Sequence, residues 1–93
     1  MKMKENFVLR QIAGAWVVLP LGAATLDLNG MLKLNESGVL LWRCLEQNGG
    51  REELIQALLD TYQVSREQAA QDVDAFLEKL IQAGCLDAQY NGE

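Results

Sequence analysis

The stretch that decides the fold is Met31-Leu32-Lys33-Leu34-Asn35-Glu36-Ser37-Gly38-Val39-Leu40-Leu41-Trp42. It opens with the apolar and polar pattern of a strand, directly after Asn29-Gly30. That dipeptide is the strongest short hairpin signal, because both central residues of the tight turn need positive φ. From Asn35 the apolar period becomes helical, and the Asn35 side chain is suited to cap the first turn. The stretch therefore predicts a strand that passes into a helix with almost no loop between them.

Upstream of this point the pattern predicts a sheet. Residues 7–12 and 15–19 are rich in β-branched and aromatic side chains, and Ala13-Gly14 separates them as a hairpin turn. Pro20 ends the second strand because it cannot donate to a ladder. Residues 25–28 and 31–34 flank Asn29-Gly30 as a second hairpin. We expect a small antiparallel sheet of three or four strands.

Downstream the pattern predicts three helices. The first covers about residues 36–47 and stops at Asn48-Gly49-Gly50, and the second starts near Arg51 and breaks at residues 62–64. The third opens with Ser65 and Gln68, spaced as a capping box, and stops at Gly84. The fold class is therefore α+β and winged-helix-like, with a small N-terminal antiparallel sheet followed by three α-helices. Residues 1–93 form one domain, with residues 1–5 and 88–93 expected to be loose termini.

Composition excludes several function classes. The chain has 93 residues, 49% of them hydrophobic, a net charge of −5 and no histidine. A net negative charge disfavours binding to the phosphate backbone of nucleic acids. The lack of histidine removes the commonest general base and the commonest metal ligand. No apolar run spans a bilayer and residues 1–4 begin no secretory signal, so we expect a cytoplasmic protein. Cys44 and Cys85 fit no metal-ligand spacing and are expected to be reduced thiols, so no metal or cofactor is predicted.

The motif Leu34-Asn35-Glu36-Ser37-Gly38, followed by Leu41-Trp42, resembles the "L-N-E-T-[AG]…[IL]-W" signature of the PqqD-like family. This family is named after pyrroloquinoline quinone biosynthesis protein D. The similarity continues through a helix of the form "E-L-I-x-x-L…Y-x-V" at residues 53–64. It continues again through "D-V-x-x-F-L-x-x-L-x-x-x-G-x-L" at residues 72–86. Ser37 replaces the usual Thr, a conservative departure.

The resemblance implies a function as well as a fold. PqqD-like domains are RiPP recognition elements, which hold the leader segment of a ribosomally made precursor peptide and present it to a modifying enzyme. That enzyme is frequently a radical S-adenosylmethionine (radical SAM) protein. In the family the leader adds as a strand to the edge of the last β-strand and lies against the third helix. The resemblance thus implies a non-catalytic peptide-binding module with two partners, the precursor peptide and the modifying enzyme.

Strand addition is physically plausible for this chain, because an edge strand offers unpaired N–H and C=O groups to an incoming peptide. We expect the edge at residues 31–34 and the facing wall on the third helix. The residues expected to form the peptide-binding groove are Met31, Leu32, Lys33, Leu34, Val73, Phe76, Lys79 and Leu80. The competing interpretation is that the apolar members are core and that both lysines are ordinary solvated side chains. Asp72 and Asp74 point apart on a helix, which argues against joint acid–base chemistry.

Two other functions compete with peptide binding. A DNA-binding winged helix needs a basic recognition helix, whereas residues 65–84 carry four acidic side chains against Arg66 and Lys79. A structural subunit would use the same open edge for self-pairing and would form a homodimer. An enzyme is disfavoured, because the chain has no glycine-rich phosphate loop and no nucleophile–base pair.

Overall fold

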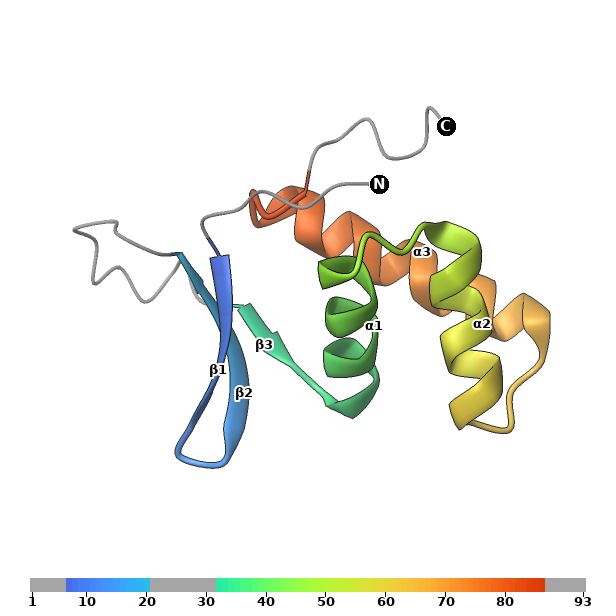
Figure 1. Ribbon diagram of the computed structural model, residues 1–93, viewed down its shortest axis with the longest axis horizontal. Helices are drawn as coiled ribbons and strands as arrows, with labels where there is room; N and C mark the ends of the chain where they lie inside the picture. Colours follow the sequence, from blue (N-terminus) through green and yellow to red (C-terminus); the bar gives the residue numbers. More distant parts are fainter. Residues whose placement is uncertain (1–6, 21–31, 87–93) are drawn as a thin grey trace.

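The protein folds as a small sheet on one side and three helices on the other (Figure 1). The structure, a computed structural model, describes residues 7–20 and 32–86. The elements are β1 (Phe7–Ile12), β2 (Ala15–Pro20), β3 (Leu32–Leu34), α1 (Glu36–Glu46), α2 (Arg51–Thr61) and α3 (Arg66–Gln82). The α+β prediction, with a sheet followed by three helices, is confirmed. The predicted strand at residues 25–28, its Asn29-Gly30 turn, Met31 and both predicted loose termini lie outside the described residues.

The hairpin between β1 and β2 has the turn that the sequence predicts. Ala13 and Gly14 both have positive φ, 52° and 83°, and Ile12 pairs directly with Ala15. Two consecutive positive-φ residues match the right-handed twist of the flanking strands. The strand order is β1-β2-β3 with antiparallel pairing throughout, so β2 is the central strand.

The two faces of the sheet differ in what they meet. Directly paired residues point to the same face, so Val18 with Leu32 and Trp16 with Leu34 share the inner face. All four belong to the core or pack against it. Lys33 pairs with Val17 and therefore shares the outer face. The alternation seen in the sequence thus places leucines toward the helices and the lysine away from them.

The junction between β3 and α1 is held by one side chain. Asn35 Oδ1 accepts hydrogen bonds from the Gly38 backbone N–H (2.9 Å) and from Ser37 Oγ (3.1 Å), as the capping prediction requires. A Cβ at Gly38 would lie 3.2 Å from Leu34 Cβ, so the helix packs tightly on the end of the strand. The direction of α1 is therefore fixed relative to the sheet edge within one turn.

The end of α1 corrects one detail of the sequence prediction. The left-handed residue that stops the helix is Asn48, with φ of 66°, and neither glycine that follows it has positive φ. Asn tolerates this conformation because its short polar side chain bonds locally. Gly49 is needed for space instead, since a Cβ there would lie 2.9 Å from the backbone oxygen of Cys44.

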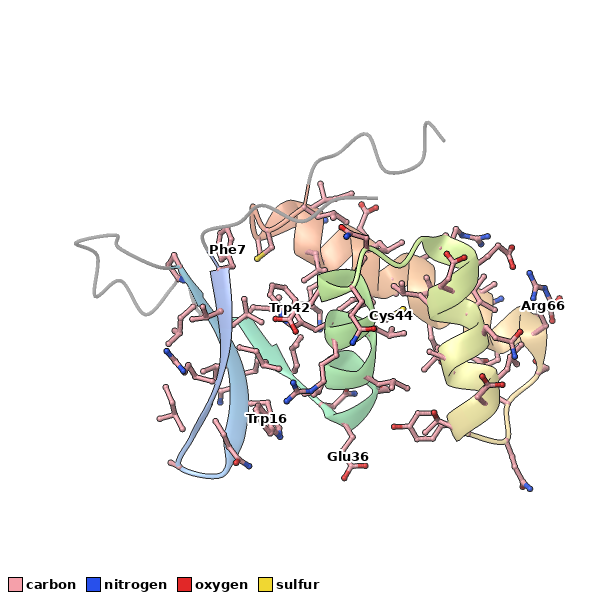
Figure 2. All side chains as sticks on the ribbon, in the orientation of Figure 1. Phe7, Trp16, Glu36, Trp42, Cys44 and Arg66 are labelled. Carbon is pink, nitrogen blue, oxygen red and sulfur yellow. The ribbon has the colours of Figure 1, made fainter. Side chains whose placement is uncertain are left out.

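The helices pack around one apolar core. Trp42 is 1% exposed, and its Nε1 donates to Glu46 Oε2 at 3.0 Å, which satisfies the polar edge of the ring. In Figure 2, Trp16 projects from the sheet toward α1, where the Arg43 guanidinium lies 5.6 Å from its ring centroid. This cation–π contact joins the sheet to the first helix.

The N-terminus of α3 and the end of the chain follow the predicted signals. Ser65 Oγ accepts from the Gln68 backbone N–H at 3.1 Å, which forms the Ser65 half of the predicted capping box. Gly84 takes the left-handed conformation after α3, with φ of 81°, and Leu86 then forms an isolated β-bridge. Within residues 7–20 and 32–86, no helix is long and apolar enough to cross a membrane.

Candidate functional site

The outer edge of β3 is the first feature of the site. β3 is the last strand in the order β1-β2-β3, so within the described residues it pairs on one side and leaves its other edge open. Lys33 is exposed and Leu32 is half-buried, whereas Leu34 is 8% exposed. An open edge presents backbone N–H and C=O groups that a further strand can bind.

A cleft at the junction of β3 and α1 is the second feature. It consists of two adjoining cavities, about 280 Å³ and about 440 Å³, whose linings share Asn35, Ser37, Leu58 and Asp72. The smaller cavity also contacts Gly38, Leu41, Ala75, Phe76 and Lys79. The larger one also contacts Glu36, Tyr62 and Val64. We call the joined space the junction cleft, because it lies where β3 passes into α1 and faces α2 and α3.

The wall supplied by α3 is a single helical stripe. Asp72, Phe76 and Lys79 are spaced by four and three residues, so they lie on one face of the helix. Phe76 is 8% exposed and forms an apolar patch between two charged side chains that are exposed. The stripe therefore offers an acid, an aromatic ring and a base in that order along the cleft.

Neighbouring charges on α3 are engaged elsewhere. Asp74 receives two hydrogen bonds from the Arg51 guanidinium, at 2.8 and 3.0 Å, and these lower the pKa of that carboxyl. Asp72 instead accepts from Gln68 Nε2 at 2.9 Å. The two aspartates have different partners, as their spacing predicts, so they do not act as a carboxylate pair.

The structure separates the predicted groove residues that it describes into four groups. Phe76 and Lys79 line the junction cleft, and Leu32 and Leu34 lie on the inner face of β3 next to the core. Lys33 lies on the outer face of the sheet. Val73 and Leu80 are 0% exposed and support the helix from inside the core. Met31 lies outside the described residues.

Several cleft residues did not appear in the sequence prediction of the groove. The sequence predicts Asn35 as a helix cap and assigns Asp72 no place in the groove, and in the structure both residues line the two cavities. Tyr62 and Val64 were assigned to the break between the second and third helices. The positions of Tyr62 and Val64 in the sequence do not predict the cavity, because its existence depends on how the three helices pack against one another.

No group of three or more potential metal-ligating side chains occurs among residues 7–20 and 32–86. Neither Cys44 nor Cys85 forms a disulfide, and Cys85 is 2% exposed. The pKa of the Cys44 thiol is raised, chiefly by its burial and further by the nearby Glu53 carboxylate. A raised pKa keeps this thiol protonated at neutral pH and makes it a poor nucleophile.

Comparison with known proteins identifies a family and similar folds. Residues 15–86 match the model of the family described as coenzyme PQQ synthesis protein D (PqqD). A solved structure of TbiB1 in complex with the TbiA(beta) leader peptide has a TM-score of 0.76 and 27% identity, covering 95% of this chain and 96% of that one. A lasso peptide synthetase B1 complexed with its leader peptide has a TM-score of 0.71 and 20% identity, covering 90% and 93%. No curated protein sequence matches the chain.

Proposed function

The chain belongs to the family of coenzyme PQQ synthesis protein D, and from this premise we propose that it binds the leader segment of a ribosomally made precursor peptide. The observation that carries the proposal is the open edge of β3 beside the junction cleft. An extended leader would pair with β3 and place alternate side chains toward the cleft. The protein of 27% identity described above is a complex with a leader peptide, which supports the same assignment.

Backbone pairing alone is too weak to explain such binding. β3 has three residues, and alternate residues direct their backbone groups to opposite sides, so its open edge offers about two to four hydrogen bonds. Each contributes a net of about 0.5–1.5 kcal/mol, and ordering a free peptide offsets much of the sum. Apolar burial in the cleft must therefore supply both affinity and selectivity.

The register predicts which peptide side chains meet which residues. Peptide residues on the inner side of the extended sheet would contact Leu32, Leu34 and Phe76. Those on the outer side would lie beside Lys33, because that residue shares the outer face. We propose that Lys33 attracts an acidic residue on the outward-facing side of the leader and that Lys79 attracts another from within the cleft.

The second partner in the proposal is the enzyme that modifies the peptide, which we propose is a radical SAM protein. In this assignment the present chain performs no chemistry of its own, in keeping with the raised pKa of Cys44 and the lack of a metal-ligand cluster in its described part. We also place the protein in the cytoplasm, where free thiols such as Cys44 and Cys85 stay reduced.

DNA binding through α3 is disfavoured by the charges on that helix. Arg66 is paired with Glu52, and this contact lowers the pKa of the Glu52 carboxyl. The remaining exposed charges on the helix include Glu67, Asp72 and Glu78. A helix with this balance repels a phosphate backbone. No observation favours self-pairing over peptide binding at the β3 edge.

The proposal is tested by searching for a precursor peptide encoded near the gene for this chain and titrating its leader half into the protein. Calorimetry should give saturable one-to-one binding, and the core half of the same precursor should not bind. The proposal fails if neither half binds. A salt-sensitive gel shift with duplex DNA would favour the competing function instead.

Charge-reversal variants locate the binding surface. Lys33→Glu and Lys79→Glu should each weaken leader binding. In each variant, replacing one acidic leader residue with lysine should restore part of the lost affinity. Arg10→Glu is the matched control, because Arg10 is an exposed cation on β1, at the opposite edge of the sheet. Equal weakening by all three variants would indicate a general charge effect and would argue against the β3 edge.

A further inference from the structure

The junction cleft has opposite charges at its two ends. Lys79 lines the smaller cavity, Glu36 lines the larger cavity, and Asp72 lines both. Figure 2 shows Glu36 at the start of α1, with its side chain extending beyond the end of the helix. The cleft is therefore polarised, with Lys79 in the smaller cavity, Glu36 in the larger cavity and Asp72 where the two adjoin.

The larger cavity combines an apolar wall with these carboxylates. Leu58, Tyr62 and Val64 supply the wall, and the charged residues that line it, Glu36 and Asp72, are both acidic. Neither acid forms an ion pair with any residue of the described part of the chain. An apolar wall next to carboxylates that have no cationic partner in the described residues fits a side chain with an aliphatic stem and a cationic head. Lysine and arginine have this structure.

An anionic ligand does not fit this cavity, although the N-terminus of α1 borders it. The helix end carries about half a positive charge, which the full charges of Glu36 and Asp72 exceed. The Gly38 N–H already donates to Asn35 Oδ1, so this donor is not available to an anion. The electrostatics of the cavity therefore favour a cation.

We propose that the larger cavity binds a lysine or arginine side chain of the peptide held at the β3 edge. The inference rests on the proposed function and adds a charge requirement to it. The bound peptide carries an acidic residue that meets Lys79 and a basic residue that enters the cavity between Glu36 and Asp72. Apolar residues of the peptide cover Phe76 between the two charged contacts.

The helix fixes the spacing of the two charges. Asp72 and Lys79 are seven residues apart on α3, which corresponds to about 10 Å along the helix axis. An extended peptide advances by about 3.3 Å per residue, so about three residues span that distance. Side chains that enter the cleft from one face of an extended peptide are an even number of positions apart, so the acidic and basic residues are separated by two or four positions. Their order along the peptide reports whether it runs parallel or antiparallel to β3.

A displayed library of random 16-residue peptides tests this requirement on the intact protein. Selection on the wild type should enrich peptides with alternating apolar residues and with a basic residue two or four positions from an acidic one. Selection on Glu36→Gln/Asp72→Asn should enrich the apolar alternation without the basic residue. Glu67→Gln/Glu78→Gln is the matched control, because it removes two exposed acids of α3 that lie outside the cleft lining.

Affinity measurements then separate this inference from the proposed function. Replacing the basic residue of a selected peptide with norleucine should weaken binding by about threefold to fivefold to the wild type and to the control variant. The same replacement should have less than about a twofold effect on Glu36→Gln/Asp72→Asn. Enrichment of apolar alternation without any basic residue would overturn the charge requirement and leave peptide binding intact. Failure to enrich any alternating peptide would count against the proposed function itself.

Discussion

Replacing Asn35 with alanine tests the junction on which both the sheet edge and the cleft depend. The change removes two hydrogen bonds, one from the Gly38 N–H at 2.9 Å and one from Ser37 Oγ at 3.1 Å. Loss of an N-cap acceptor lowers the free energy of unfolding by about 1 kcal/mol, within a range of about 0.5–2. For a domain of this size, that corresponds to a decrease in Tm of about 4–8 °C.

Thermal and urea unfolding followed by circular dichroism measure the effect, with Asn35→Asp as the matched control. Aspartate keeps the side-chain acceptor, so its stability should stay within about 0.5 kcal/mol of the wild type. Ser65→Ala removes the equivalent cap of α3 and should cost a similar amount. The two losses should add in the double variant, because the caps are on different helices. A wild-type Tm for Asn35→Ala, or a loss for Asn35→Asp as large as that for alanine, would refute this account of the junction.

Three further outcomes are expected. Gly49→Ala should destabilise the protein by about 1–3 kcal/mol in urea unfolding, since the new Cβ would lie 2.9 Å from the Cys44 oxygen; unchanged stability would contradict this. Asp74→Asn should lower stability at pH 7, because Arg51 lowers the folded-state pKa of Asp74. The difference should shrink as the pH falls below the ordinary aspartate pKa of 3.8 and vanish only below the lowered folded-state pKa; a pH-independent difference would contradict the ion pair. At pH 7.5, Cys44 should react with iodoacetamide more slowly than the thiol of glutathione does. It should react faster in Glu53→Gln than in the wild type, because the variant removes one cause of the raised pKa; rapid alkylation of the wild type would contradict that raised pKa.

Local signals predicted most of the described fold. The Ala13-Gly14 turn, the Asn35 and Ser65 caps and the Gly84 stop all lie where the sequence places them. Each signal depends on one residue and its immediate neighbours, which is why a single sequence reveals it. The end of α1 was less predictable, because Asn48 takes the left-handed position and the adjacent glycine serves a packing contact.

The candidate site was harder to predict, because it depends on contacts between distant segments. Helical periodicity placed Phe76 on the apolar stripe, but periodicity does not distinguish a residue that lines a cleft from Val73, which is 0% exposed. Alternation in the sequence places Lys33 on the face opposite Leu32 and Leu34, but the open edge of β3 follows from the strand order, which the local pattern does not reveal. The cavity beside Tyr62 forms between α1, α2 and α3, and nothing in the local sequence pattern indicates how these helices pack against one another.

The most direct test of the account is amide hydrogen exchange of the protein with and without its leader peptide, read residue by residue. We predict slower exchange on leader binding for the β3 amides that face away from β2, with unchanged exchange along β1. NMR chemical-shift changes at Phe76 and Lys79 should accompany the slower exchange, because the same peptide fills the junction cleft. Protection confined to β1, or leader binding that leaves β3 exchange unaltered, would contradict strand addition at this edge.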